Sequence, residues 1–332
     1  MAINLAKKAD PKVLERFKLG SVTEGIFSNR YNWTGVATVQ VYSVDTVALG
    51  NYNKALTSGS RFGSLTELGD TMQEMTVSQD KAFNISIDKG NNTAQLMIKS
   101  AASVLRRETD EVIIPYVDKY NLGVFNTGAG LLHLPTASIT KANIIETIMT
   151  ANAKMSNLNV PKSDRVCYIG ETLAIQAKIA TEVIAVESVG AKPLVNGVLG
   201  TIDGLQIRVV PDSYMPTGAA FIIVRKGAAA APKKIETYRI LEEHPDVDGA
   251  VVQGRLLHDC FVFDTNADAV LVCSVVASAS GGGYAYERVI NPTGNPYSLG
   301  YFTRTANTNA MTAVPSTETT VVTGHVYYKR LS

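Results

Sequence analysis

The sequence has little charge and few residues suited to catalysis or metal binding. Charged residues make up 18% of its 332 residues, below the ~25% that is usual for soluble domains. Interface centres are depleted in charge because desolvating an ion is costly. A chain with so little charge is therefore a candidate for extensive self-association. The 31 basic and 30 acidic residues nearly cancel, so no overall field exists to hold nucleic acid or an anionic membrane.

The cysteines and histidines are also sparse. Cys167, Cys260 and Cys273 are too few and too scattered for a disulfide framework. The four histidines are spread along the chain, and no paired-cysteine spacing, nucleophile elbow or phosphate-binding loop is present. We therefore predict no cofactor and no bound metal.

No segment of the sequence suits a membrane. The longest uncharged stretch, Asn121 to Thr140, contains three glycines and a proline, which does not fit a bilayer span. The N-terminus carries charges where a secretory signal needs an apolar run. We predict neither a membrane partner nor a secretory signal.

One cluster contains the residue types of a hydrolase, His258-Asp259-Cys260. In a strand, His258 and Cys260 would share one face and Asp259 would point away. A triad needs the carboxylate on the imidazole, and the apolar neighbours favour a packed strand. We expect no enzyme, with a hydrolase using His258 or Cys260 as an alternative.

The first part of the chain predicts an arm followed by a long excursion. Residues 1–35 form a mixed-charge arm, either solvated or docked on a neighbour or on phosphate. Apolar and polar residues then alternate over 39–41 and 83–87, which indicates strands. The polar segment between them predicts a two-stranded ribbon that leaves the body near residue 50 and returns near 80. Such a ribbon is marginal alone in water and would need another surface, unless it is a disordered loop.

The strongest helical signal spans residues 92–126. Its apolar stripe is spaced at four, four, seven, four and four residues, at Met97, Ala101, Leu105, Val112, Tyr116 and Tyr120. Such a helix is roughly 50 Å long, with Thr93 as its N-cap and a kink at Pro115. A second helix is predicted over 139–157.

The remaining chain mixes strands and helices. Asp203-Gly204 predicts a two-residue hairpin turn. A helix is predicted over 171–186, and strands over 166–169, 220–225, 234–240, 251–263 and 270–276. Since these elements do not follow a regular βαβ order, the fold class is α+β. A linker at 277–283 precedes a small β module with strands at 297–304 and 319–329.

Several segments resemble tailed-bacteriophage major capsid proteins in their order and spacing over about residues 25–276. They are Gly35-Val-Ala-Thr-Val-Gln-Val-Tyr42, Leu49-Gly-Asn-Tyr-Asn53, Thr76-Val-Ser-Gln-Asp-Lys-Ala-Phe-Asn-Ile-Ser-Ile-Asp88, Asp203-Gly-Leu-Gln-Ile-Arg-Val-Val-Pro211, Phe221-Ile-Ile-Val224 and Gly249-Ala-Val-Val-Gln-Gly-Arg-Leu-Leu-His-Asp-Cys-Phe-Val262. The resemblance implies the Hong Kong 97-type capsid fold. Its parts would be an N-terminal arm (1–35), a peripheral strand with an extended loop (36–90, loop about 50–82), a peripheral spine helix (91–138), an axial domain (139–245), returning peripheral strands (246–276) and a linker with a β extension (277–332).

The implied function is to build, without catalysis, an icosahedral head shell around double-stranded DNA. The chain would assemble with itself as pentamers and hexamers in the host bacterial cytoplasm and become part of the virion. Further partners would be a portal, a separate scaffolding protein or none, and DNA bound without sequence specificity. The candidate inter-subunit contacts in the loop are Arg61, Phe62, Glu67, Asp70 and Glu74, and Lys7, Lys8 and Lys12 would face DNA or scaffold.

Two further alternatives are an encapsulin-like compartment with protein cargo and a phage structural or adhesion protein that binds carbohydrate. In the latter, the C-terminal module would stack Tyr284, Tyr286, Tyr297 and Tyr301 on sugar.

Overall fold

The computed structural model describes most of the chain. The described residues are 20–31, 33, 38–55, 60–94, 100–180, 200–242, 245, 248–275, 284–289, 295–304, 311–318, 320–322 and 325–331. Lys7, Lys8 and Lys12, the linker 277–283 and the end of the helix predicted over 171–186 lie outside this range.

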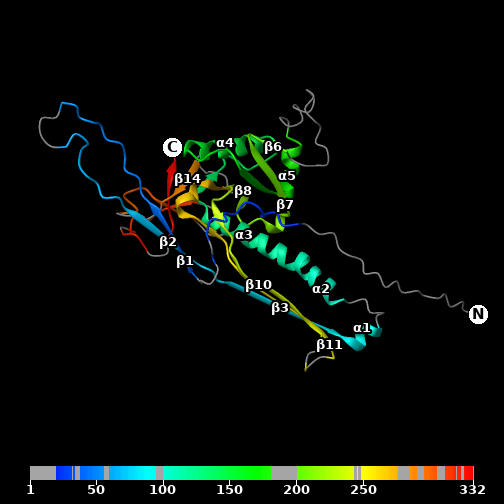
Figure 1. Cartoon of the computed structure of the whole chain (residues 1–332). Helices are drawn as coiled ribbons and strands as arrows, with labels where there is room; N and C mark the ends of the chain where they lie inside the picture. The colour runs from blue at the N-terminus through cyan, green and yellow to red at the C-terminus, as the bar shows by residue number, and fades with distance from the viewer. Residues whose placement is uncertain are drawn as a thin grey trace, which may run out of the picture.

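A mixed ten-stranded sheet forms the body (Figure 1), in the order β16-β15-β17-β14-β4-β13-β8-β5-β7-β6. Its strands are β4 (Leu131–Leu134), β5 (Arg165–Gly170), β6 (Thr201–Ile202), β7 (Leu205–Val210), β8 (Ala219–Arg225), β13 (Val270–Ser274), β14 (Tyr284–Arg288), β15 (Phe302–Arg304), β16 (Met311–Ala313) and β17 (Tyr327–Leu331). The pairs β13–β4 and β5–β7 are parallel. The predicted hairpin turn is confirmed, because Asp203 and Gly204 both have positive φ, 47° and 79°, as its turn type requires.

The central strands are apolar on both faces. In β5, Val166 and Tyr168 belong to one core, and Cys167 and Ile169 belong to the other. On the first face the sheet packs against Leu122 and Phe125 of helix α3 (Ile114–Gly128). On the second face lie α4 (Ile144–Asn157) and α5 (Glu171–Lys178). Burial on both faces explains why these strands read as continuous apolar runs.

The long helix, hereafter the spine helix, differs from its predicted bounds. It consists of α2 (Ala101–Glu108), a π-helical segment (Thr109–Ile113) and α3, and a separate short helix α1 covers Lys89–Ala94. The prediction of one helix from residue 92 is wrong, because Ser100 is extended (φ −91°, ψ 132°) at the N-cap of α2, a position that favours serine.

The π-helical segment ends two residues before Pro115, whose missing N–H disturbs the regular α-helical ladder. The wider turn also shifts the apolar stripe, so that Val112, one of its predicted members, is 51% exposed.

A second sheet lies along the spine helix. It contains β3 (Gln79–Asp88), β10 (Lys233–Leu241) and β11 (Gly249–His258), with β11 in the centre. The Lys81 ammonium lies 5.9 Å from the centre of the Tyr116 ring of the helix. β11 begins at Gly249 (φ +155°), where a Cβ atom would lie 2.1 Å from the Ile87 carbonyl oxygen, so only glycine fits.

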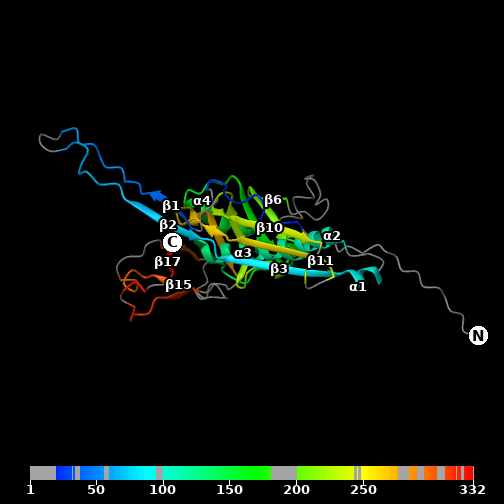
Figure 2. The same ribbon diagram turned by 60° about the horizontal axis from the view of Figure 1, so that its bottom comes forward.

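The predicted ribbon is present. Strands β1 (Thr38–Val44) and β2 (Asp70–Thr76) pair antiparallel, and the ribbon (residues 38–76) projects away from the body in Figures 1 and 2. Its bounds differ from the predicted 50–82, because the paired base begins at Thr38 and residues 79–88 belong to β3.

Other predicted bounds also shift. α4 begins at Ile144 rather than residue 139, since the Asn143 side chain accepts the Thr140 N–H at 2.7 Å and ends the preceding turn. The strand predicted over 251–263 is divided into β11 and β12 (Phe261–Val262), and β12 pairs with β9 (Ala229–Ala230).

In the C-terminal part, β15 and β17 are shorter than predicted. The C-terminal strands continue the body sheet, because β14 pairs with β4.

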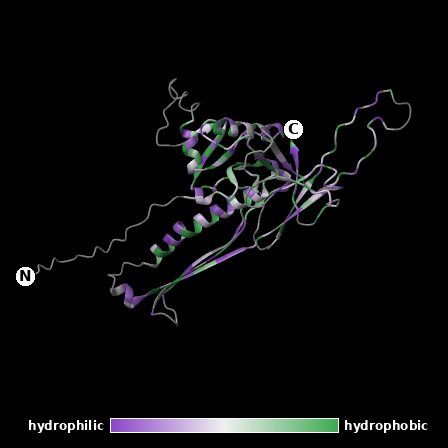
Figure 3. Cartoon of the chain, turned by 180° about the vertical axis from the view of Figure 1, so that it is seen from behind, coloured by the Kyte–Doolittle hydropathy of each residue, from purple (hydrophilic) through white to green (hydrophobic). Residues whose placement is uncertain are grey.

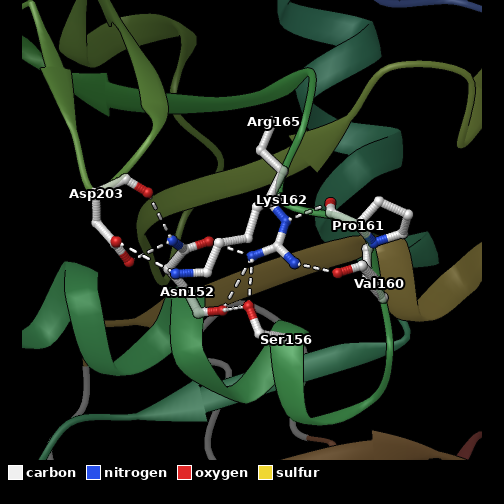
Figure 4. Close-up of polar contacts among 7 residues, drawn as sticks. All are labelled: Asn152, Ser156, Val160, Pro161, Lys162, Arg165 and Asp203. Carbon is white, nitrogen blue, oxygen red and sulfur yellow. Dashed lines mark hydrogen bonds and ion pairs between the residues drawn. The ribbon is translucent and has the colours of Figure 1, made fainter.

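The Arg165 side chain, 1% exposed, ties α4 to the sheet (Figure 4). Its guanidinium donates to the carbonyls of Pro161 (2.9 Å), Asn152 (3.0 Å) and Val160 (2.5 Å), and to the Asn152 side chain. Asn152 in turn donates to the Asp203 carboxylate at 2.7 Å. A buried cation at the C-terminal end of a helix is favourable because carbonyl groups point there.

We predict that Arg165→Ala lowers the free energy of unfolding by roughly 2–4 kcal/mol, because several buried carbonyls lose their donor. Lys162→Ala is the control. It removes an exposed ion pair with Asp203 (3.3 Å, Lys162 side chain 57% exposed) and should cost at most ~1 kcal/mol. Denaturant unfolding of the isolated subunit measures both, and equal losses would contradict this role of Arg165.

Candidate assembly surfaces

The ribbon exposes an unusual number of large apolar side chains. Leu49 and Leu65 are fully exposed, and Phe62 is 85% exposed. Tyr42, Val44, Val47, Tyr52, Leu68 and Met72 are exposed as well. Figure 3 shows hydrophobic and hydrophilic residues interspersed along this projecting segment. Exposed apolar surface of this kind marks an interaction site.

The five contact residues predicted from the sequence all lie exposed on the ribbon. Asp70 and Glu74 stand on β2, whereas Arg61, Phe62 and Glu67 lie in its tip (residues 45–69). Within the described part of the chain, the four charged members have no ion-pair partner, so they are available to another surface. The prediction missed Leu49 and Leu65, although an apolar residue within a polar loop was a usable signal.

The tip keeps some internal order. The Asp45 N–H donates to the Gly69 carbonyl at 3.0 Å, and the Asn53 N–H donates to the Arg61 carbonyl at 3.1 Å. The rings of Tyr52 and Phe62 meet edge to face at 5.1 Å. These contacts hold the two sides of the tip together but bury little apolar surface.

The base of the ribbon, in contrast, has its own small core. Val41 and Met75 of the ribbon are buried against Trp33, Ala230 and Phe263. The Gln73 side chain adds a polar clamp, because it donates to the Val262 carbonyl and accepts the Asp264 N–H, both at 3.0 Å. The ribbon is therefore fixed at its base and free of the body at its tip.

A buried carboxylate joins the ribbon to the spine helix. Asp259, 4% exposed, accepts the Ser78 N–H (2.8 Å) and hydroxyl (2.9 Å) on one oxygen. The other oxygen accepts the Tyr120 hydroxyl (2.6 Å) and the Cys260 N–H (2.8 Å). Burial and the hydrogen bond to Asp259 raise the pKa of Tyr120, so its hydroxyl keeps its proton at neutral pH. We call Ser78, Tyr120 and Asp259 the junction.

The junction also answers the hydrolase alternative. The bonds of Asp259 go to Ser78, Tyr120 and Cys260, not to the His258 imidazole, which packs edge-on against the Tyr116 and Tyr120 rings at 5.6 and 5.4 Å. Burial raises the pKa of the Cys260 thiol. In β5, outside this cluster, burial likewise raises the pKa of the Cys167 thiol to about 12. This cluster therefore supplies neither a triad nor a thiolate.

Among the described tyrosines of the C-terminal part, two that the carbohydrate alternative requires are packed against other rings. The Tyr286 ring is buried against Phe302 at 5.2 Å, and the Tyr301 ring packs against Tyr327 at 6.0 Å. Tyr297 is 51% exposed, and the Tyr284 side chain lies outside the described residues.

Neither a metal site nor a membrane span is found in the described residues. They contain no group of three metal-ligating side chains. Within the same residues, no helix is both long and apolar enough to cross a bilayer.

Comparisons with known proteins give structural matches alone, since no family model and no curated sequence matches the chain. A structure from Mycobacterium phage Che8 has a TM-score of 0.68 at 16% identity, over 82% of this chain and 98% of that chain. The capsid structure of the cyanophage P-SCSP1u has a TM-score of 0.68 at 14% identity, over 82% and 93%. The mature capsid of bacteriophage PhiM1 gives 0.66 at 9% identity, over 82% and 92%. The predicted Hong Kong 97-type fold is confirmed.

We predict that the subunit loses stability on mild acidification through His258. Burial lowers the pKa of His258, an effect that Asp259 opposes and that Lys233 and Lys81 reinforce. The unfolded chain therefore binds this proton at a higher pH than the folded chain. Stability should fall as the pH drops below ~6.5, the usual histidine pKa. Unfolding of wild type and His258→Gln from pH 8 to 5 tests this, and the same slope in both would refute it.

Proposed function

We propose that the chain is the major capsid protein of a tailed bacteriophage, which assembles in many copies into the icosahedral head shell around double-stranded DNA. The observation that carries this proposal is the ribbon, which is anchored at its base and apolar at its exposed tip. Such an element gains stability when it lies on another surface. The shared fold with phage capsid structures supports a second copy of the chain as that surface.

Energetics favour repeated contacts of this kind. Burial of one Leu or Phe side chain contributes roughly 1.5–3 kcal/mol, and the ribbon offers Leu49, Phe62 and Leu65 in each copy. Ion pairs through Arg61, Glu67, Asp70 and Glu74 would add only ~0–1 kcal/mol each. The apolar residues therefore supply most of the association energy, and the charges select the orientation.

We assign the domains as follows. The spine helix, β3 and β11 form the peripheral domain, within 36–138 and 246–276, and β10, from the end of segment 139–245, completes their sheet. Residues 139–245, with α4, α5 and β5–β8, form most of the axial domain. The arm 1–35 and the extension 277–332 complete the chain. In this arrangement the ribbon and the peripheral domain contact neighbours within pentamers and hexamers.

The finer partners are part of the same proposal. Lys7, Lys8 and Lys12 would face DNA or a scaffolding protein, and a portal would occupy one vertex. With a net charge of +1 the chain has no strong overall attraction for phosphate, so the shell would enclose DNA without binding it sequence-specifically. The virion is the expected location. An encapsulin-like compartment differs in its contents, so nucleic acid or protein cargo inside isolated particles decides between the two.

The direct test is assembly of the purified chain. Sedimentation velocity and negative-stain microscopy should show closed particles of many copies, with scaffolding protein added if needed. A chain that stays monomeric at high concentration, even with scaffold present, would overturn the proposal.

We predict that shortening the ribbon tip blocks assembly without unfolding the subunit. Replacement of residues 50–65 by a short Gly-Ser turn keeps the bond between Asp45 and Gly69 and the whole base. The subunit should keep its melting temperature within a few degrees and form no particles. Phe62→Ser with Leu65→Ser should weaken assembly at least ~10-fold, whereas Phe62→Leu, the matched control, should assemble. Normal particles from the shortened variant would show that the tip is no contact element.

A further inference from the structure

The junction lies where the ribbon joins the body, so it can control the direction in which the ribbon projects. Ser78 lies between the end of β2 at Thr76 and the start of β3 at Gln79. Here the chain passes from the projecting ribbon to the sheet beside the spine helix. The direction of the ribbon therefore depends on the backbone at this point.

Asp259 fixes that backbone on two sides. One carboxylate oxygen binds the Ser78 main chain and side chain, and the other binds Tyr120 of the spine helix. Hydrogen bonds to a charged acceptor are directional and stronger than neutral ones. The carboxylate thus sets the angle between Ser78 and the spine helix.

Because the ribbon is long, a small rotation at Ser78 displaces its tip by a large distance. Ser78 is 17 residues from Arg61 in the tip, and 17 residues can span roughly 55 Å at ~3.3 Å per residue, so a rotation of about 5° at Ser78 displaces the tip by about 5 Å. That shift is as large as the spacing between neighbouring strands, about 4.7–4.9 Å. A tip displaced so far would meet its neighbour at a different site.

One member of the junction, Asp259, borders a cavity. A cavity of about 640 Å³ is lined by His258 and Asp259 together with Thr23 and Asn121. On this side Asp259 borders open space instead of packed side chains, so its hydrogen bonds to Ser78 and Tyr120 position the carboxylate. The Gln73 clamp lies farther along the ribbon and binds to β12 and Asp264, not to the spine helix.

We propose that Asp259 is a positioning residue for assembly, which fixes the ribbon at one angle to the spine helix and so sets the curvature and diameter of the shell. This inference rests on the proposed function. It adds that a single buried carboxylate, distant from the tip, selects among possible shell sizes.

The test removes one oxygen at a time. Tyr120→Phe and Ser78→Ala each delete a hydroxyl that donates to Asp259 and leave the surrounding packing in place. Tyr116→Phe is the matched control, since Tyr116 lies one turn away on the same helix and donates to Gln79 at 3.4 Å. These variants are preferable to Asp259→Ala, which leaves buried donors unpaired and endangers folding.

Two readouts separate positioning from stability. Amide hydrogen exchange over residues 70–78 of the isolated subunit should rise at least ~10-fold in Tyr120→Phe and Ser78→Ala, as loss of a charge-assisted hydrogen bond predicts. Electron microscopy should show a broad or shifted distribution of particle diameters for both variants. Tyr116→Phe should match wild type in both measurements.

The outcomes distinguish this inference from the proposed function. If wild type forms no particles, the proposed function fails and the inference fails with it. If wild type assembles and Tyr120→Phe and Ser78→Ala give particles of the same diameter, the positioning role is wrong and the proposed function stands. Equal effects of Tyr120→Phe and Tyr116→Phe would also overturn it, because they would indicate a general packing effect.

Discussion

The ribbon cannot bury its own apolar side chains, and the rest of the structure is organised around that constraint. Two strands form a single layer, so each face needs a covering surface. At the base the body provides one, where Val41 and Met75 are buried against Trp33 and Phe263. Toward the tip no described residue covers Leu49 or Leu65. One element is therefore divided into a buried anchor and an exposed contact surface, a division that favours association over a stable monomeric state.

Such a contact is specific only if the body is stiff. The sheet has helices on both faces, and strands such as β5 and β8 are buried on both sides, so bending it would open two cores. Arg165 joins the end of α4 to this sheet. At the spine helix, Asp118 accepts hydrogen bonds from Ser21, Val22 and Thr23 of the N-terminal segment. These contacts join the sheet, α4, the spine helix and the N-terminal segment into one body.

The sequence predicted those features that local patterns determine. Alternation around Val39 and Ile85 indicated the strands, and Asp203-Gly204 indicated a turn that the structure contains. It could not give the helix start at Ala101, because the apolar stripe includes Met97 and so does not mark the extended Ser100. It could not give the exposure of Val112 either, because a π-helical segment changes the period of the stripe. Long-range pairings were also out of reach. The contact of Ser78 with Asp259 joins residues 181 positions apart, and β14 joins β4 across a linker. The predicted contact residues lie on the ribbon, but the prediction does not include Leu49 and Leu65, because isolated apolar residues in a polar loop form no periodic pattern.

The two buried carboxylates, Asp118 and Asp259, show how residue types that are common in catalytic sites can instead hold structural elements in place. Asp259 stands between a histidine and a cysteine, as in a hydrolase, but its donors are hydroxyl and amide groups from three separate segments. Asp118 is satisfied in the same way by Ser21 and Thr23. Burying an ion contributes little net stability, since desolvation offsets the attraction. What a multiply bonded carboxylate does provide is a single arrangement of its donors, because any rotation would leave one of them unpaired in a water-poor site. If the ribbon lies on a second copy, as proposed, a single arrangement of these donors would fix where it lies, which offsets the small contribution of the buried carboxylate to stability.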